Sequence, residues 1–249
     1  MPALTDLIVP EWPAPEGVSA FFTTRHGGVS TGDFASLNLG LHVGDDIDAV
    51  AENRRRISDL LPAQPVWLNQ VHGTRVAYAD DVQAGSAAPE ADASMSGMPA
   101  TPCAVLVADC LPVLFCDTSG LKVAAAHAGW RGLAAGVLER TVEAMRVPPA
   151  KTMAWLGPAI GATAFEVGQD VVDHFTSLSP AAATAFRNIE GKPGKYLADM
   201  VELAKQRLRS AGVEQIYGGQ FCTVTEPGRF FSYRRDGRTG RMAAVIWRR

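Results

Sequence analysis

Three side chains that can bind a metal each follow an apolar run that predicts a strand. His72 stands in LNQVHG, Cys110 in VADCLP and His127 in AAAHAG. A rigid sheet positions groups at its strand ends while the adjoining loops open to solvent, so catalytic residues are often found there. Two imidazoles and one thiolate form a three-ligand zinc set that leaves a fourth position for water or substrate. The residue types therefore indicate an open metal site.

The same residues allow other interpretations. Cys110 could be a nucleophile with His127 as its base, because an activated thiol and a zinc thiolate both need deprotonated sulfur. With a weak axial methionine, Met95 or Met98, the set would be of the blue-copper type. A multicopper site needs many more imidazoles than the five histidines of this chain. Cysteine and histidine also occur as hydrogen-bonded core residues without a chemical role.

The periodicity of the apolar residues predicts which elements carry these side chains. Strands are expected at 18–24, 65–71, 74–79, 102–109, 112–117, 121–127, 152–158, 213–219 and 242–247. Helices are expected at 49–61, 133–145, 169–178 and 196–212, and 81–97 resembles a linker. Since the strands between 102 and 127 follow one another at hairpin spacing, a regular βαβ alternation is excluded. The pattern predicts a mixed-sheet α/β or α+β fold.

Length and composition are those of an ordinary soluble globular protein. The chain has 249 residues, a net charge of −3 and 20% charged residues, so it can bury a large core without a disulfide or metal to hold it together. We expect one domain over 1–249. The charge balance shows no footprint of nucleic-acid or membrane binding, so the expected partner is a small molecule.

The cysteines and the start of the chain indicate a compartment. The first twenty residues contain prolines and acidic residues but no long apolar core, which argues against a secretory or transit peptide. Four unevenly spaced cysteines do not form a disulfide framework and are expected as thiols. We therefore expect a cytoplasmic protein, and a monomer.

Several motifs together resemble one known family. NQVHG, ADCLPVLF, HAGWRG and FFSYRRDGRTGRM, with TTRHGGVSTGDFASLNLGLHVGDD and GPAIGATAFEVG, occur in this order along nearly the whole chain. In these motifs the chain resembles the YfiH-type laccase-domain family, also called purine nucleoside phosphorylase or polyphenol oxidase family proteins. The resemblance implies a single domain with a four-layer α/β/β/α arrangement, and a zinc site at His72, Cys110 and His127.

The resemblance also implies an activity, although it defines the site better than the substrate. It implies phosphorolysis of adenosine, inosine, guanosine and methylthioadenosine, with deamination of adenosine as a second activity. Some relatives are described as peptidoglycan editing factors, and older descriptions name copper-dependent polyphenol oxidases. For phosphorolysis and deamination the metal would be Zn²⁺, and inorganic phosphate would be the co-substrate of phosphorolysis. Cu²⁺ is the less favoured metal.

Phosphorolysis needs groups that hold phosphate, and arginine does this through bidentate, charge-assisted hydrogen bonds. The candidate phosphate-binding or substrate-binding residues are Arg25, Asn38, Arg54, Arg131, Tyr233, Arg234 and Arg235. His42, in GLHVGDD, is expected to order its loop through a hydrogen bond rather than to act directly.

Four further residues are expected to shape the site. Asp92 and Asp109 are candidates to orient an imidazole. Neighbours on a strand point to opposite faces, which would direct Asp109 away from the site. Gly129 and Gly132 allow a tight turn into a helix near Leu133, whose N-terminus would favour an anion.

These observations support four functions in a definite order. The first is a zinc-dependent purine nucleoside phosphorylase with adenosine deaminase side activity, using His72, Cys110 and His127. The second is a hydrolase that edits a peptidoglycan precursor with Cys110 and His127 as its working pair. The third is a noncatalytic metal-binding module, and the last is a copper polyphenol oxidase.

Overall fold

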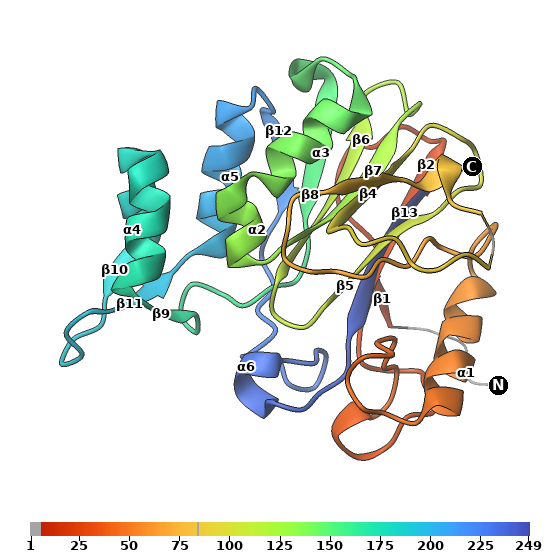
Figure 1. The fold of residues 1–249 in the computed structure, drawn as a ribbon, viewed down its shortest axis with the longest axis horizontal. Coiled ribbons are helices and arrows are strands. Elements are labelled where there is room, and N and C mark those ends of the chain that lie inside the picture. The colour runs from red at the N-terminus through yellow and green to blue at the C-terminus, as the bar shows by residue number, and fades with distance from the viewer. Residues whose placement is uncertain (1–5, 84) are drawn as a thin grey trace.

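The apolar segments form two large sheets in the computed structural model, which describes residues 6–83 and 85–249 (Figure 1). The six-stranded sheet has, in spatial order, β12 (Gln215–Gly218), β8 (Thr152–Leu156), β6 (Leu111–Asp117), β7 (Val123–Ala128), β4 (Ala93–Ser96) and β3 (Val76–Tyr78). The four-stranded sheet has β1 (Leu7–Ile8), β2 (Val18–Thr23), β13 (Met242–Arg248) and β5 (Cys103–Val107). A small sheet contains β10 (Phe186–Asn188), β11 (Lys195–Ala198) and β9 (Glu166–Gly168).

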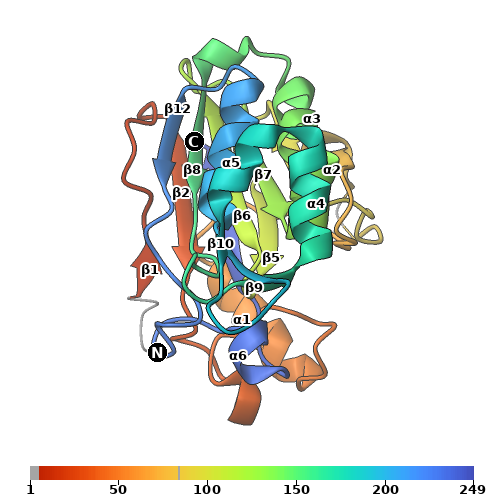
Figure 2. The same cartoon turned by 90° about the vertical axis from the view of Figure 1, so that its left-hand side faces the viewer.

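Helices lie around these sheets. They are α1 (Ile47–Ser58), α2 (Trp130–Ala135), α3 (Val137–Met145), α4 (Gln169–Leu178), α5 (Met200–Ser210) and α6 (Tyr233–Asp236), with short 3₁₀ turns at Gly32–Phe34, Ala79–Asp81, Pro149–Lys151 and Pro180–Ala185. Figure 2 shows α3 and α5 in front of the six-stranded sheet. None of the helices in the described part of the chain has the length and apolar content that a membrane span requires.

Three apolar cores hold these elements together. One core lies between the six-stranded sheet and the helices, and it contains Phe115, Leu138 and Leu203. The second lies between the two large sheets and contains Leu114 and Trp155. Because β6 is covered on both faces, all seven of its residues are buried and its sequence is a continuous apolar run rather than an alternating one.

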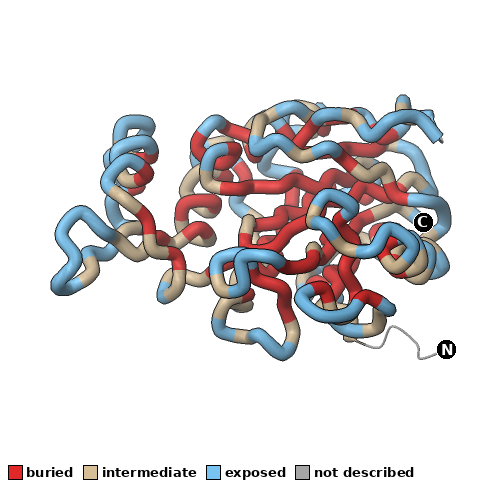
Figure 3. The backbone as a smooth tube through the Cα atoms, turned by 60° about the horizontal axis from the view of Figure 1, so that its bottom comes forward, coloured by how far each residue is buried: buried red, intermediate tan, exposed pale blue. Residues whose placement is uncertain are grey.

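The third core covers the outer face of the four-stranded sheet. Leu37 and Leu39 of a loop and Ile57 of α1 pack there against strand residues. Figure 3 shows the buried backbone running through the middle of the molecule, with exposed segments around it. The predicted mixed α/β class is confirmed. The four-layer order stays an expectation, and on this side of the molecule one helix and a loop cover the sheet.

One predicted strand is absent, and one strand lies inside the segment expected to be a linker. The segment 65–71 is not a strand and has only isolated bridges at Val66 and Asn69. There the side chain of Gln70 replaces part of a ladder, because it accepts from the backbone N of Leu106 and donates to its carbonyl. The expected linker 81–97 contains β4, a fully buried strand of small residues.

Two predicted helices have different starts. The helix expected at 133–145 begins at Trp130, and Gly136, in the left-handed region at φ 99°, divides it into α2 and α3. The helix expected at 196–212 begins at Met200, because Tyr196 pairs in β11 and the Asp199 side chain caps the helix by accepting from Glu202 N.

The core between the sheets makes a stability prediction. Leu114→Ala should lower the free energy of unfolding by about 2–5 kcal/mol, because it removes a fully buried side chain from a packed core. Leu121→Ala is the matched control, since the Leu121 side chain is 55% exposed. Urea denaturation of both variants measures the difference, and equal midpoints would contradict the packing described for β6.

Candidate metal centre

The three metal-binding side chains of the sequence meet in one cluster. One donor atom from each of His72, Cys110 and His127 lies within 4.8 Å of the others. Cys110 Sγ is 3.7 Å from His72 Nε2, and the centroids of the two imidazole rings are 4.7 Å apart. The predicted convergence of these residues is therefore present in the structure.

The hairpin of β6 and β7 explains how Cys110 reaches His127. Their antiparallel register pairs Leu111 with Ala128 and Pro112 with His127. Cys110 directly precedes β6 and so lies beside the end of β7. His72 comes from the loop before β3, where its backbone is in the left-handed region at φ 61°.

Asp92 holds both histidines in place. Its buried carboxylate accepts from His127 Nδ1 at 2.8 Å and from the backbone N–H groups of Val71, His72 and Gly73 at 3.2, 2.9 and 2.6 Å. Asp92 and His127 share a second hydrogen bond, in which the backbone N–H of His127 donates to the backbone carbonyl of Asp92. The role expected for Asp92 is thus consistent with the structure, and one carboxylate connects the His72 loop to β7.

Gly129 lets the backbone approach the donors closely. A Cβ at this position would lie 2.5 Å from His72 Cδ2 and 3.1 Å from Cys110 Sγ, so a larger residue would displace both. Gly129 is also the N-cap residue of α2, which begins at Trp130 rather than near Leu133 as predicted. The helix has only six residues.

One of the donor distances, that between Cys110 Sγ and His72 Nε2, fits a small tetrahedral ion. Bond lengths of about 2.3 Å to sulfur and about 2.0 Å to nitrogen place sulfur and nitrogen about 3.6 Å apart at a tetrahedral centre. The separation of Cys110 Sγ and His72 Nε2 is close to this value. Asp92 occupies His127 Nδ1, which leaves Nε2 of that ring for a metal. His127 is buried while His72 is exposed, so the open side of the cluster faces the loop of His72.

Without a metal, the charges of Cys110 and His127 shift each other's pKa. Burial by itself raises the pKa of the Cys110 thiol, but the charge of His127 and hydrogen bonds from His127 and His72 outweigh it and lower the pKa to about 6. Burial lowers the pKa of His127, but the Cys110 charge and the hydrogen bond to Asp92 raise it to about 9. Cys110 and His127 therefore form a thiolate–imidazolium pair near neutral pH.

Several candidate substrate residues have partners within the protein. Arg25 donates to the carbonyls of Ala35 and Pro227, and Arg235 forms an ion pair with Asp236. The Arg234 side chain donates to the Glu166 carbonyl. Binding of substrate or phosphate by these arginines stays a prediction.

The remaining candidates, Asn38, Tyr233 and Arg131, differ in how far they are buried. Asn38 is buried, and its Oδ1 accepts from the backbone N of Gly40 and Arg241. Tyr233 is 62% exposed, and Arg131 is exposed and stacks on Trp130. Their contact with substrate also stays a prediction.

Asp109 points away from the cluster, as its position beside Cys110 predicts. Its carboxylate accepts from Thr223 Oγ1, Ser232 Oγ and the backbone N of Arg234 at 2.5, 3.0 and 2.6 Å. It thereby ties the turn before β6 to the C-terminal segment. Arg241 stands in the motif FFSYRRDGRTGRM but is not among the residues predicted from the sequence.

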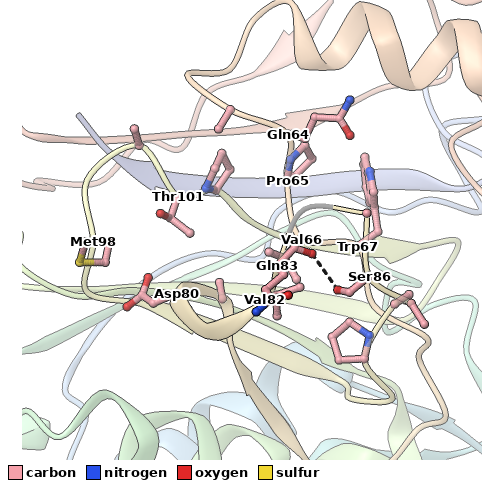
Figure 4. Close-up of a pocket in the computed structure, with 18 of the residues that line it drawn as sticks. Gln64, Pro65, Val66, Trp67, Asp80, Val82, Gln83, Ser86, Met98 and Thr101 are labelled. Atoms are coloured by element: carbon pink, nitrogen blue, oxygen red, sulfur yellow. Dashed lines mark hydrogen bonds between the residues drawn. The ribbon is translucent and has the colours of Figure 1, made fainter.

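A cavity of about 690 Å³ lies apart from the cluster (Figure 4). Trp67, Gln83, Met98 and Thr101 line it, and none of the three metal-binding residues does. The cavity adjoins Pro102, before the start of β5, whereas Cys110 follows the end of that strand. The cavity is therefore not part of the candidate metal centre. Met98 lines this cavity and so does not supply an axial ligand to a metal at the cluster.

The sequence identifies the family. The family model described as multi-copper polyphenol oxidoreductase laccase matches residues 19–249, and the chain belongs to this family. The chain is 54% identical to the purine nucleoside phosphorylase YfiH of Escherichia coli K12 over 98% of this chain and 99% of that protein. It is 53% identical to a purine nucleoside phosphorylase of Pseudomonas aeruginosa, over 96% and 97% of the two chains. The YfiH-type resemblance is confirmed.

Solved structures of similar proteins have the same fold. Protein NMB0706 of Neisseria meningitidis has a TM-score of 0.94 and 54% identity, with 98% of this chain and 99% of that chain covered. YlmD of Geobacillus stearothermophilus has a TM-score of 0.87 and 37% identity, with 95% and 94% covered. The chain therefore spans nearly the full length of these relatives.

Asp92→Asn should weaken metal binding by about 10–100-fold, because the amide no longer accepts from all of its present donors and the imidazole of His127 loses its orienting charge. Competition with a chelating dye measures the affinity. Asp33→Asn, at an exposed position, is the matched control. Equal affinities of the two variants would show that Asp92 does not act on the metal donors.

Alkylation of Cys110 in chelated protein should follow a pKa of about 6. The rate should fall as the pH drops below 6, because the thiol takes up its proton, and should level off above about pH 7. Iodoacetamide labelling followed by peptide mass spectrometry measures this profile. A rate that keeps rising to pH 9, as for an ordinary thiol, would contradict the thiolate–imidazolium pair.

Proposed function

We propose that the protein is a zinc-dependent purine nucleoside phosphorylase that acts as a cytoplasmic monomer on small nucleosides such as adenosine, inosine, guanosine and methylthioadenosine. The observation that carries the proposal is the His72, Cys110 and His127 cluster, which has metal-binding geometry and an open side. Support comes from relatives of nearly equal length that are named purine nucleoside phosphorylases.

Zinc suits the donors better than copper does. Two imidazoles and one thiolate, with a carboxylate behind one imidazole, are a typical set for catalytic zinc. In the described part of the chain this is the one group of three or more such donors, whereas a multicopper centre needs a second. When bound, zinc would supply a fixed positive charge and a Lewis acid at the open side.

Phosphorolysis exchanges one bond to the ribose for another. A phosphate oxygen forms a bond to C1′, the bond from C1′ to the purine nitrogen breaks, and its electron pair leaves with the purine, which takes up a proton. When the bond to the purine is largely broken and the bond to phosphate is not yet complete, the sugar is cationic, so positioning of both anion and base dominates catalysis. Asp92 keeps the His127 ring fixed, and Gly129 keeps Cys110 and His72 in contact. Both constraints exist before substrate arrives, which lowers the cost of reorganisation.

Deamination of adenosine is the second activity in the proposal. It requires addition of water at the purine ring and release of ammonia, and an activated water at the open side of the same cluster would supply this chemistry. The appearance of inosine from adenosine without phosphate measures it.

A second candidate function rests on one specific observation. Asp92, His127 and Cys110 form a line of carboxylate, imidazole and thiolate, which is also the order of a nucleophilic triad. A cysteine hydrolase that removes an amino acid from a cell-wall precursor would use this line. Such an enzyme stays active after chelation and is silenced by alkylation of Cys110.

The test is chromatographic and uses zinc-loaded protein with inosine, with and without inorganic phosphate. We expect release of hypoxanthine only with phosphate, and a loss of about 100-fold or more in Cys110→Ala, because removal of the thiolate removes a metal ligand. Cys116→Ala is the control, since Cys116 lies six residues along β6 and away from the cluster. Base release that does not need phosphate, or no release at all, would contradict the proposal.

A further inference from the structure

Two arginines that contact the loop at residues 39 and 40, Arg241 and Arg54, are partly buried and lack a carboxylate partner among the described residues. No ion pair within the described residues includes Arg54 or Arg241. Burial lowers the pKa of both, that of Arg54 to about 10. Holding a guanidinium away from water without a counter-charge is unfavourable. Such a group is typical of a site that receives its anion from solution.

Arg241 lies close to the residues beside the metal centre. Its guanidinium carbon is 5.9 Å from the ring centroid of Tyr233, and the next residue, Arg234, donates its backbone N–H to Asp109, which precedes Cys110. Arg241 directly precedes β13, and Cys110, Asp109 and Tyr233 act on it, each raising its pKa against the effect of burial. Its Nη1 donates to the carbonyls of Thr239 and Gly240, which fixes the plane of the guanidinium. In the described part of the chain its other guanidinium N–H groups have no hydrogen-bond partner. They remain available to an anion.

One short loop connects Arg241 to Arg54. The Leu39 N–H donates to the Arg241 carbonyl at 3.0 Å, and the Leu39 carbonyl accepts from Arg54 Nε at 2.9 Å. Gly40 lies against the Arg241 side chain, where a Cβ would be only 2.8 Å from Cγ. The loop therefore requires glycine at position 40 and holds both arginines at defined places.

His42 follows two residues later and lies within the field of both arginines. Burial, the charge of Arg241 and the charge of Arg54 all lower its pKa. Its ring is therefore neutral near pH 7 and has one nitrogen that accepts and one that donates. A monoprotonated phosphate has both a hydroxyl donor and anionic acceptors, so it complements a neutral imidazole beside a guanidinium.

We propose that Arg241 and His42 form the binding site for inorganic phosphate beside the metal centre, and that Arg54 contributes a second fixed positive charge to it. This assignment rests on the proposed phosphorolysis, because phosphate is the co-substrate of that reaction. Because Arg241 uses only Nη1 for its hydrogen bonds to the described residues, it can bind the anion through its other N–H groups without losing an internal bond.

The experiment measures binding of inorganic phosphate by calorimetry to zinc-loaded protein, without nucleoside and therefore without turnover. In Arg241→Gln the Kd for phosphate should rise at least tenfold, in His42→Asn about fivefold and in Arg54→Gln about threefold. Arg241→Lys keeps the charge but loses the planar fork, so its Kd should lie between those of the native protein and Arg241→Gln. Arg209→Gln, in the last turn of α5, is the matched control and should bind as the native protein does.

Melting temperature and zinc content of each variant establish that the fold and the metal centre are intact. Unchanged phosphate affinity in folded Arg241→Gln and Arg241→Lys, or no phosphate binding by the native protein, would overturn the assignment. Base release from inosine is measured separately on the native protein. If phosphate-dependent release occurs while Arg241 variants bind phosphate normally, the proposed function stands and this site is wrong. If phosphate binding depends on Arg241 but no base is released, the anion site stands and phosphorolysis is wrong.

Discussion

The candidate metal centre depends on one buried carboxylate. Asp92 accepts a hydrogen bond from the ring of His127 and three more from the backbone of residues 71–73. Burial by itself raises the pKa of Asp92, but the hydrogen bonds from His127 and from the backbone outweigh it and lower the pKa. The charge is therefore stable in the interior because its donors are already in place. Without it the backbone N–H groups of residues 71–73 would lose their acceptor, and the left-handed backbone of His72 would be held only through its neighbours.

Two other buried polar side chains, Asp109 and Asn38, also hold loops near the cluster by accepting several hydrogen bonds. Asp109 binds the C-terminal segment through Thr223, Ser232 and the Arg234 backbone. Asn38 binds Gly40 and Arg241 through its amide. Each is a short side chain that accepts several hydrogen bonds from irregular segments, and these bonds give the segments the rigidity that strands obtain from a ladder.

Sequence patterns predicted the parts of this arrangement that depend on local order. Cys110 and His127 end apolar runs, and the hairpin spacing of those runs brings the two residues together. Strand β4 was missed because Ala93 and Ser94 have low strand propensity, and burial between β7 and β3 rather than propensity makes them a strand. Arg241 was missed because a charged residue in a run of arginines is usually a solvated one. Only the fold shows that it is partly buried and forms no ion pair within the described residues.

The three metal donors come from segments that meet only when the β6–β7 hairpin has formed and the loop before β3 has docked on it. An extended chain separates His72 from Cys110 by 38 residues and presents no array that could bind an ion with comparable affinity. A ligand that binds only the native state adds RT ln(1 + [L]/Kd) to the free energy of unfolding, about 2.7 kcal/mol at a hundredfold excess over Kd. Metal supply would therefore set not only the chemistry of the centre but also the population of folded molecules, and a shortage of the ion would expose the chain to proteolysis.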